Sequence, residues 1–265
     1  MTLAGHTPEG ARSEGIPYEL PFEIPFEDAL PRKFQTIEHV ESIVWHGLRG
    51  QLDEDAMRRL AEKIAASGTP VTPTLIAHDN LVRIAASDGA YLDRPGVETI
   101  NPFLSYMDKG TREFWSGVDP DAYEAPRAEF YLKATRLMHE AGVPLIIGTD
   151  AGILTNIPGS SMTRELELFV EAGISPYDSL LAATRMNAEA LGLEQTGQIA
   201  PGYRANLVLL SGDPLSDIRV VETPDGVMVQ GYWLNKAGLD NMQHGARDTS
   251  FLRSARRAIE MVVSQ

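Results

Sequence analysis

Apolar positions recur at helical spacing in two long stretches of the chain. In residues 53–67 they fall on one face, Asp53 stands where an N-cap is expected, and Gly68 follows the last turn. Residues 127–141 repeat this pattern, with Gly142 directly after them. The apolar positions of the first stretch are Met57, Leu60, Ala61, Ile64 and Ala65. The spacing predicts a helix over each stretch.

Short apolar runs alternate with these and further helical stretches. We predict strands at 36–39, 71–76 and 143–148, and two more helices at 163–172 and 176–191. Strands that alternate with helices are typical of an α/β fold with a parallel sheet. Short β runs at 206–210 and 227–234 and an amphipathic helix at 248–263 then close the chain. By contrast, the prolines in residues 15–33 rule out a continuous helix there.

Composition and charge narrow the class of protein. The 265 residues carry a formal net charge of −14 and no cysteine. A thiolate metal site, a disulfide and a cysteine nucleophile are therefore excluded. The negative charge opposes binding to nucleic acid and to an anionic membrane surface. We find no apolar run long enough to span a membrane and no signal-peptide pattern. We favour the cytoplasm as the location of the protein. The location stays unknown, because the N-terminus of this sequence need not be the natural one.

Three polar residues stand where a ligand site is expected in an α/β fold. His6, His39 and Asp150 each follow a short apolar or β-like run, and parallel strands direct their C-terminal ends toward one crevice. Imidazole and carboxylate are good ligands for zinc and similar ions. A plainer interpretation also exists, in which the histidines are ordinary hydrogen-bonded residues and Asp150 caps the following segment.

His78 follows the predicted strand at 71–76 and is a candidate for lining a substrate pocket, although a structural role is the commoner one for such a residue. Other chemistries have no motif in the sequence. There is no nucleophile elbow, no phosphate-binding P-loop and no dinucleotide fingerprint.

A succession of motifs in residues 146–210 resembles the C-terminal region of the amidohydrolase superfamily. It is most similar to the branch that contains imidazolonepropionase and the Xaa-Pro dipeptidase-like hydrolases. Asn206 stands where an Asp is usual. The motifs lie, in this order, at 147–152, 158–159, 164–173, 182–188, 191–192, 197–199, 201–202 and 205–210.

This resemblance implies roles for individual residues. His6 and His39 match the metal-ligating histidines at the ends of the fifth and sixth barrel strands. Residues 71–75 match the seventh strand. Asp150 matches the eighth-strand aspartate, which binds metal and moves a proton during catalysis. The first-strand His-x-His pair and the fourth-strand Lys of such families have no counterpart here.

The resemblance therefore implies an α/β fold with an incomplete (β/α)8 TIM-type barrel, about strands 5–8, in residues 1–193. Residues 194–265 are expected to form part of a small β-sandwich domain and a C-terminal helix. The implied function is hydrolysis of amide, cyclic amide or dipeptide C–N bonds by water activated on one or two divalent metal ions, zinc being favoured.

Two alternatives stay open. One is a catalytically inactive truncated fragment, and the other is an ester or phosphotriester hydrolase on the same scaffold. We expect a small-molecule substrate. Because half a barrel has unpaired strand edges, we also expect self-association, for example into a homo-oligomer.

Overall fold

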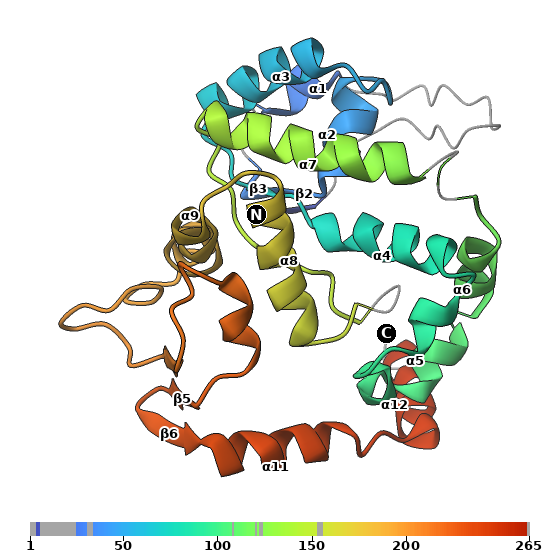
Figure 1. Cartoon of the computed structure of the whole chain (residues 1–265), viewed down its shortest axis with the longest axis vertical. Coiled ribbons are helices and arrows are strands. Elements are labelled where there is room, and N and C mark those ends of the chain that lie inside the picture. The colour runs from blue at the N-terminus through green and yellow to red at the C-terminus, as the bar shows by residue number, and fades with distance from the viewer. Residues whose placement is uncertain are drawn as a thin grey trace.

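Four chain segments lie side by side in parallel at the centre of the molecule (Figure 1). The computed structural model describes residues 4–5, 25–30, 34–107, 109–119, 121, 124–152 and 156–263. Strands β1 (Ala4–Gly5), β2 (Thr36–Glu38) and β3 (Val71–Thr72) form a parallel sheet in that order. Leu145 then forms a parallel bridge with Val71 on the far side of β3. The neighbours in space are thus neighbours in sequence, as in a βα-repeat fold.

Helices connect and cover these segments, which confirms the α/β class. α3 packs against α7, and α4 packs against both α7 and α8 (Figure 1). The helices of this part of the chain are α1 (Phe26–Ala29), α2 (Val40–Gly47), α3 (Glu54–Ser67), α4 (Leu75–Ala86), α5 (Pro102–Met107), α6 (Lys109–Ser116), α7 (Glu124–Glu140), α8 (Ser160–Glu171), α9 (Pro176–Leu181) and α10 (Asn187–Ala190). Short 3-10 turns η2 (Ala90–Asp93) and η3 (Val97–Thr99) follow α4, and a π-helical segment η4 (Ala182–Met186) joins α9 to α10.

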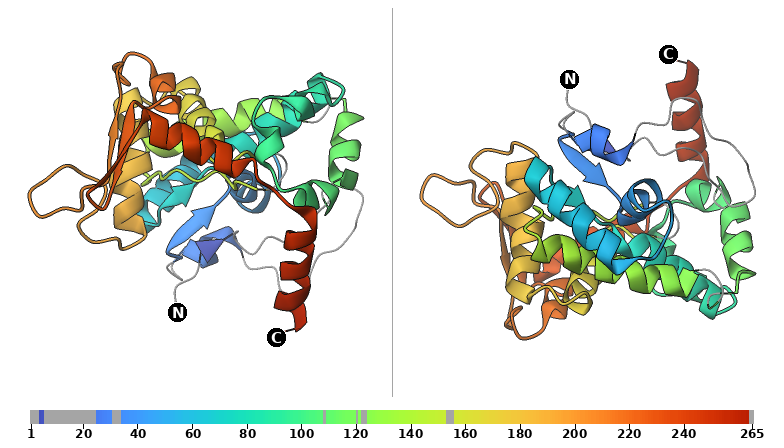
Figure 2. Two further views of the ribbon diagram at one scale, coloured as in Figure 1. Left: turned by 90° about the horizontal axis from the view of Figure 1, so that it is seen from below. Right: turned by 90° about the horizontal axis from the view of Figure 1, so that it is seen from above.

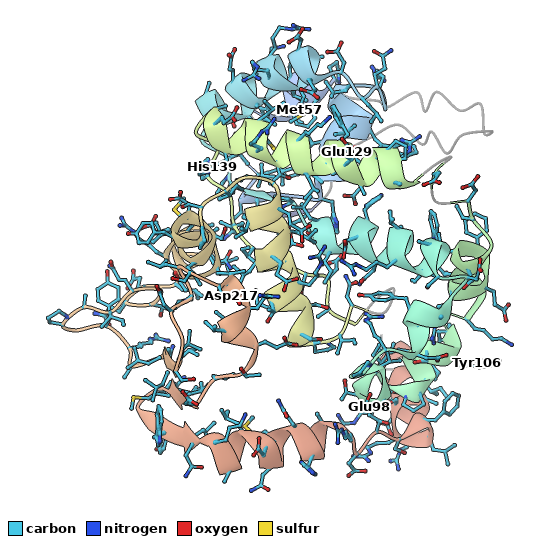
Figure 3. All side chains as sticks on the ribbon, in the orientation of Figure 1. Met57, Glu98, Tyr106, Glu129, His139 and Asp217 are labelled. Carbon is cyan, nitrogen blue, oxygen red and sulfur yellow. The ribbon has the colours of Figure 1, made fainter. Side chains whose placement is uncertain are left out.

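The two long helices predicted from periodicity are confirmed. The Asp53 carboxylate accepts a hydrogen bond from the Ala56 N–H at 2.9 Å, and Gly68 ends α3 in the left-handed conformation. The apolar face of α3 is buried against α7, and Met57 on that face is fully enclosed (Figure 3). Burial of this shared stripe holds the helix pair over the sheet.

Three strand and helix predictions need correction. Of residues 71–76, only Val71 and Thr72 are strand, since α4 already begins at Leu75. Residues 143–148 contribute a single bridge at Leu145 rather than a full strand. The helix expected at 163–172 begins earlier, at Ser160. Apolar runs this short satisfy a buried strand and a buried helix equally well, so periodicity does not separate them.

The C-terminal part of the chain forms a separate antiparallel sheet. β4 (Leu207–Leu209), β5 (Gly226–Val229) and β6 (Tyr232–Asn235) pair in that order, with η5 (Ile218–Glu222) before β5. The run expected as one strand at 227–234 is therefore a hairpin. Its two-residue turn, Gln230-Gly231, has positive φ at both positions, as a type I′ turn requires.

Two helices follow this sheet. α11 (Lys236–Ala246) was not predicted, and α12 (Phe251–Val263) lies within the expected range. Figure 2 shows α12 extending away from the body of the molecule in both views, while its first part packs on α5. None of the helices in the described ranges combines the length and the apolar character needed to cross a membrane.

Candidate active site at the strand ends

Three non-glycine residues with positive φ follow three adjacent parallel segments. They are His39 after β2 (φ 68°), Thr74 after β3 (φ 51°) and Asp150 after the Leu145 segment (φ 49°). Positive φ is rare for side chains with a Cβ, and such backbone conformations concentrate at functional sites. The shared positive φ thus marks the edge of the sheet at which the parallel strands end.

Two of the residues predicted from the sequence meet at this edge. The Nε2 atom of His39 lies 3.2 Å from Oδ2 of Asp150. The His39 side chain is 11% exposed and that of Asp150 is 37% exposed, so the pair has a buried side and a side open to solvent. The third predicted ligand, His6, lies outside the described residues.

Glu41 holds the other side of the His39 ring. Its Oε1 lies 3.2 Å from His39 Nδ1, and its Oε2 lies 4.0 Å from His78 Nδ1. Glu41 lies in the first turn of α2, two positions after His39, which precedes the helix. A carboxylate on one imidazole nitrogen fixes the ring and directs the other nitrogen, here toward Asp150.

His78, predicted to follow a strand, lies on α4, one turn into the helix. Its ring packs edge-to-face on Tyr131, with the ring centroids 4.7 Å apart. The Tyr131 hydroxyl in turn accepts a hydrogen bond from Trp45 Nε1 at 3.2 Å, and the Arg127 guanidinium lies over the Trp45 ring. The structure therefore brings His39, His78 and Asp150 into one neighbourhood, with Glu41 between the two histidines.

The pKa values of these groups respond to burial and to the shared carboxylate. Burial lowers the pKa of His39, but its hydrogen bond to Glu41 and the charges of Glu41 and Asp150 outweigh burial, so the net direction is upward. Burial raises the pKa of Glu41, yet the hydrogen bond with His39 and the nearby His78 lower it overall. For His78 burial prevails and lowers the pKa, which favours the neutral ring.

Hydrogen bonds to Asn156 hold the turn that carries Asp150. The Asn156 side chain donates a hydrogen bond to the Thr149 carbonyl at 2.6 Å, and the backbone carbonyl of Asn156 accepts one from the Gly152 N–H at 2.8 Å. Asn156 also accepts a hydrogen bond from the Asn80 side chain of α4. Both asparagines are fully buried, so the backbone on either side of Asp150 is held in place.

The donor atoms of His39 and Asp150 fit a metal ion in type and spacing. Two ligand atoms of one tetrahedral zinc ion, each bound at roughly 2.0–2.1 Å, lie about 3.3 Å apart, and the separation here is 3.2 Å. Within the described ranges, His, Asp and Glu side chains form no group of three or more that could hold an ion. The described residues thus supply a fitting pair of donors, and a full ligand set needs further ones.

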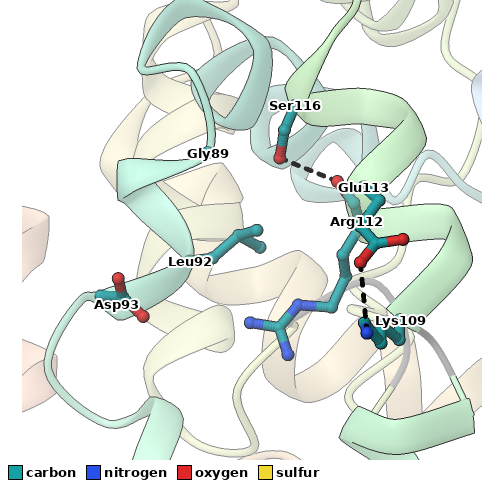
Figure 4. Close-up of a pocket in the computed structure, with 7 residues that line it drawn as sticks. All are labelled: Gly89, Leu92, Asp93, Lys109, Arg112, Glu113 and Ser116. Carbon is teal, nitrogen blue, oxygen red and sulfur yellow. Dashed lines mark hydrogen bonds and ion pairs between the residues drawn. The ribbon is translucent and has the colours of Figure 1, made fainter.

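A separate surface pocket of about 390 Å³ lies between η2 and α6 (Figure 4). Its lining includes Arg112, Lys109, Asp93 and Leu92, and none of the strand-end residues. Because it contains neither a histidine nor a strand-end carboxylate, it is not the candidate active site.

Sequence reasoning missed Glu41 and Tyr131. For Glu41 a signal existed, because it follows a candidate ligand by two positions at the end of a strand, where side chains face the ligand edge. Tyr131 had no such signal, since it lies inside a helix at an ordinary apolar position. His139, by contrast, lies at the C-terminal end of α7, 3.9 Å from Asp178 (Figure 3).

Known proteins share both sequence and fold with this chain. Ochratoxinase from Aspergillus niger is 35% identical over 103 residues, which are 38% of this chain and 20% of that protein. Imidazolonepropionase from Geobacillus kaustophilus is 30% identical over 174 residues, 62% of this chain and 38% of that protein. The chain thus spans well under half the length of these relatives.

Solved structures agree in fold. Bottromycin amidohydrolase superimposes with a TM-score of 0.65 at 22% identity, over 94% of this chain and 54% of that one. A Xaa-Pro dipeptidase with bound methionine gives a TM-score of 0.53 at 23% identity, over 79% of this chain and 42% of that one.

The sequence profile of the Amidohydrolase family matches residues 35–234, about three quarters of the chain, including His39, Glu41, His78 and Asp150. Relatives of this family have a TIM-barrel-like hydrolase fold, and the four parallel segments with their helical connections agree with it. By sequence and by fold, this chain is a member of the amidohydrolase family.

Proposed function

We propose that this chain carries part of the active site of a hydrolase that cleaves carbon–nitrogen bonds with the help of a divalent metal ion. The observation that carries the proposal is the 3.2 Å approach of His39 Nε2 to Asp150 Oδ2, with Glu41 on the opposite ring nitrogen. Enzymes of the family are generally metal-dependent, and this donor pair suits zinc. His39 and Asp150 would hold the ion, together with His6 as predicted from the sequence.

A metal ion bound there would activate water near neutral pH and polarise a carbonyl group. Asp150 is the part-exposed member of the pair, so its carboxylate can take a proton from water and pass it to the leaving nitrogen. Glu41 fixes the ring plane of His39. His78, neutral and packed on Tyr131, is proposed to line the substrate pocket.

The names of similar proteins support a proposal about the substrate class. Imidazolonepropionase, Xaa-Pro dipeptidase and ochratoxinase are the named proteins this chain is similar to. We propose an amide, cyclic amide or dipeptide bond as the target. An ester or phosphotriester bond is the alternative on the same scaffold, and a panel of amide and ester substrates separates the two.

We further propose that residues 1–193 form about strands 5–8 of a (β/α)8 barrel and that 194–265 form part of a second, β-rich domain. Four adjacent parallel segments support the first part, and the antiparallel sheet β4–β5–β6 supports the second. A complete barrel has no free edge, whereas a partial one does, so self-association of this chain is expected.

Zinc binding tests the proposed site. We expect the purified chain to bind zinc stoichiometrically in a competition assay with a chromophoric chelator, and His39→Ala and Asp150→Ala to abolish that binding. His139→Ala is the matched control, because His139 lies at the C-terminal end of α7, where its Nε2 is 3.9 Å from the Asp178 carboxylate. Absence of zinc binding by the wild-type chain would favour the inactive-fragment alternative, and equal binding by His39→Ala would disprove the assigned ligand.

A further inference from the structure

The first turn of α4 is capped by a residue from another helix. Thr74 precedes the helix in the left-handed conformation and makes no side-chain cap. Instead, the Glu165 carboxyl group of α8 accepts hydrogen bonds from the Leu75 N–H at 2.9 Å and the Ile76 N–H at 2.7 Å. Glu165 is 0% exposed. A local capping residue would normally bond to these N–H groups. Here Glu165, 90 positions after Leu75, takes that role.

Arg164, next to Glu165 on α8, binds α4 one turn further along that helix. Arg164 donates to both carboxylate oxygens of Asp79, from Nη2 at 2.9 Å and from Nε at 3.0 Å. Such bidentate pairs fix orientation as well as distance. Consecutive residues of α8 therefore hold α4 at two points, and α8 lies beside the start of α4 in Figure 1.

His78 lies between these two points. Leu75 and Ile76 precede it, and Asp79 follows it. A helix fixed at both places cannot rotate about its axis, so the direction in which His78 projects is fixed too. That direction places its Nδ1 4.0 Å from the Glu41 carboxylate.

The same helix also supports Asp150. Asn80, directly after Asp79, donates to Asn156, and Asn156 donates to the carbonyl of Thr149. Thr149 is the residue before Asp150. A shift of α4 would therefore disturb both His78 and the turn that carries the candidate metal ligand.

The geometry points to Glu165 as a positioning residue of the candidate site, acting through α4 on His78 and on the Asp150 turn. This inference rests on the proposed function, in which Asp150 binds a metal ion. The Glu165 carboxyl group bonds to the Leu75 and Ile76 N–H groups and not to His39 or Asp150, so its effect on those two residues passes through α4.

The experiment compares Glu165→Gln and Glu165→Leu with Glu171→Gln. Gln keeps one acceptor oxygen, Leu keeps none, and Glu171 lies on the same helix but pairs with Arg164 and not with the Leu75 and Ile76 N–H groups. Amide hydrogen exchange at residues 75–76 and 149–152 and the zinc dissociation constant are measured on samples whose circular dichroism shows them folded.

We expect exchange at both segments to become about tenfold faster in Glu165→Leu, as loss of a buried hydrogen bond allows, and zinc affinity to fall by about tenfold. Glu165→Gln should show smaller shifts in the same directions, and Glu171→Gln none. If Glu165→Leu does not fold, the inference is decided by the direction in which Glu165→Gln changes amide exchange and zinc affinity.

Faster exchange confined to residues 75–76, with unchanged zinc affinity, would reduce Glu165 to a plain helix cap and overturn the inference. If the wild-type chain binds no zinc, the proposed function fails, but exchange at 149–152 still decides the coupling. Faster exchange there in Glu165→Gln supports positioning, and unchanged exchange refutes it.

Discussion

At the scale of single residues, Gly148 shows why a glycine stands two positions before Asp150. A Cβ added there would lie 2.6 Å from Cγ2 of Thr72, a buried side chain of β3. Thr is stiff at χ1, so it cannot simply turn away. The absence of a side chain thus lets the fourth parallel segment approach β3 closely.

Gly148→Ala is expected to lower the free energy of unfolding by about 1–3 kcal/mol, because overpacking displaces Thr72. Gly110→Ala is the control, since a Cβ at Gly110 in α6 meets nothing within 4 Å. Urea unfolding of both variants measures the difference. Equal stability of the two would show that the contact with Thr72 relaxes without cost.

At the scale of elements, α10 contacts the fourth parallel segment through one side chain, which bonds to the backbone of that segment. The Asn187 amide donates to the Ile147 carbonyl at 3.0 Å and accepts from the Ile147 N–H at 3.2 Å. This two-way contact takes the place of a neighbouring strand at that residue. It joins the helical layer to the segment that leads into Asp150.

Asn187→Ala should destabilise the fold by about 1–3 kcal/mol, because both polar groups of buried Ile147 lose their partner. Asn241→Ala, in exposed α11, makes the same change of helix propensity without that loss. Thermal unfolding of the pair checks the expectation, and matching midpoints would mean that water replaces the amide.

Prediction from sequence succeeded where an element carries its own signals and failed where it depends on distant residues. α3 has its cap, apolar stripe and terminating glycine within 16 residues, 53–68, and its bounds were predicted closely. The start of α4 has no local cap, because its cap is Glu165, so Leu75 and Ile76 were assigned to a strand.

The same reason explains which residues of the candidate site the sequence indicated and which it did not. The sequence indicated His39 and Asp150 as candidates because strand ends can be recognised locally and motifs surround Asp150, and the two side chains lie 3.2 Å apart. Glu41 and Tyr131 were not, because their importance lies in contacts with residues on other elements. The ring of Tyr131 packs on His78, although the two residues are 53 positions apart. No spacing in the sequence reveals this contact.

At the scale of the whole molecule, Glu165 should give stability a pH dependence. Burial raises its pKa from 4.5 to about 8, against the opposing effect of its two backbone hydrogen bonds. The folded chain therefore keeps a proton that the unfolded chain releases above 4.5. The contribution of this group to the free energy of unfolding falls as the pH rises from about 4.5 to about 8, by at most about 1.4 kcal/mol per pH unit.

Glu165→Gln removes that titration, so the difference in unfolding free energy between wild type and variant should change steadily between about pH 5 and about pH 8. Glu167→Gln, on the same helix and part-exposed, should follow the wild-type profile. Urea denaturation across this range measures both. Parallel profiles for wild type and Glu165→Gln would contradict the raised pKa.

The distant cap of α4 also bears on how the chain folds as it is made. Synthesis proceeds from the N-terminus at about 5–20 residues per second, and Glu165 follows Leu75 by 90 residues. For about 5–18 seconds the emerging α4 segment has no partner for its first amides. Its final form has to await α8, so the strand-end site is completed late, after most of this part of the chain has left the ribosome.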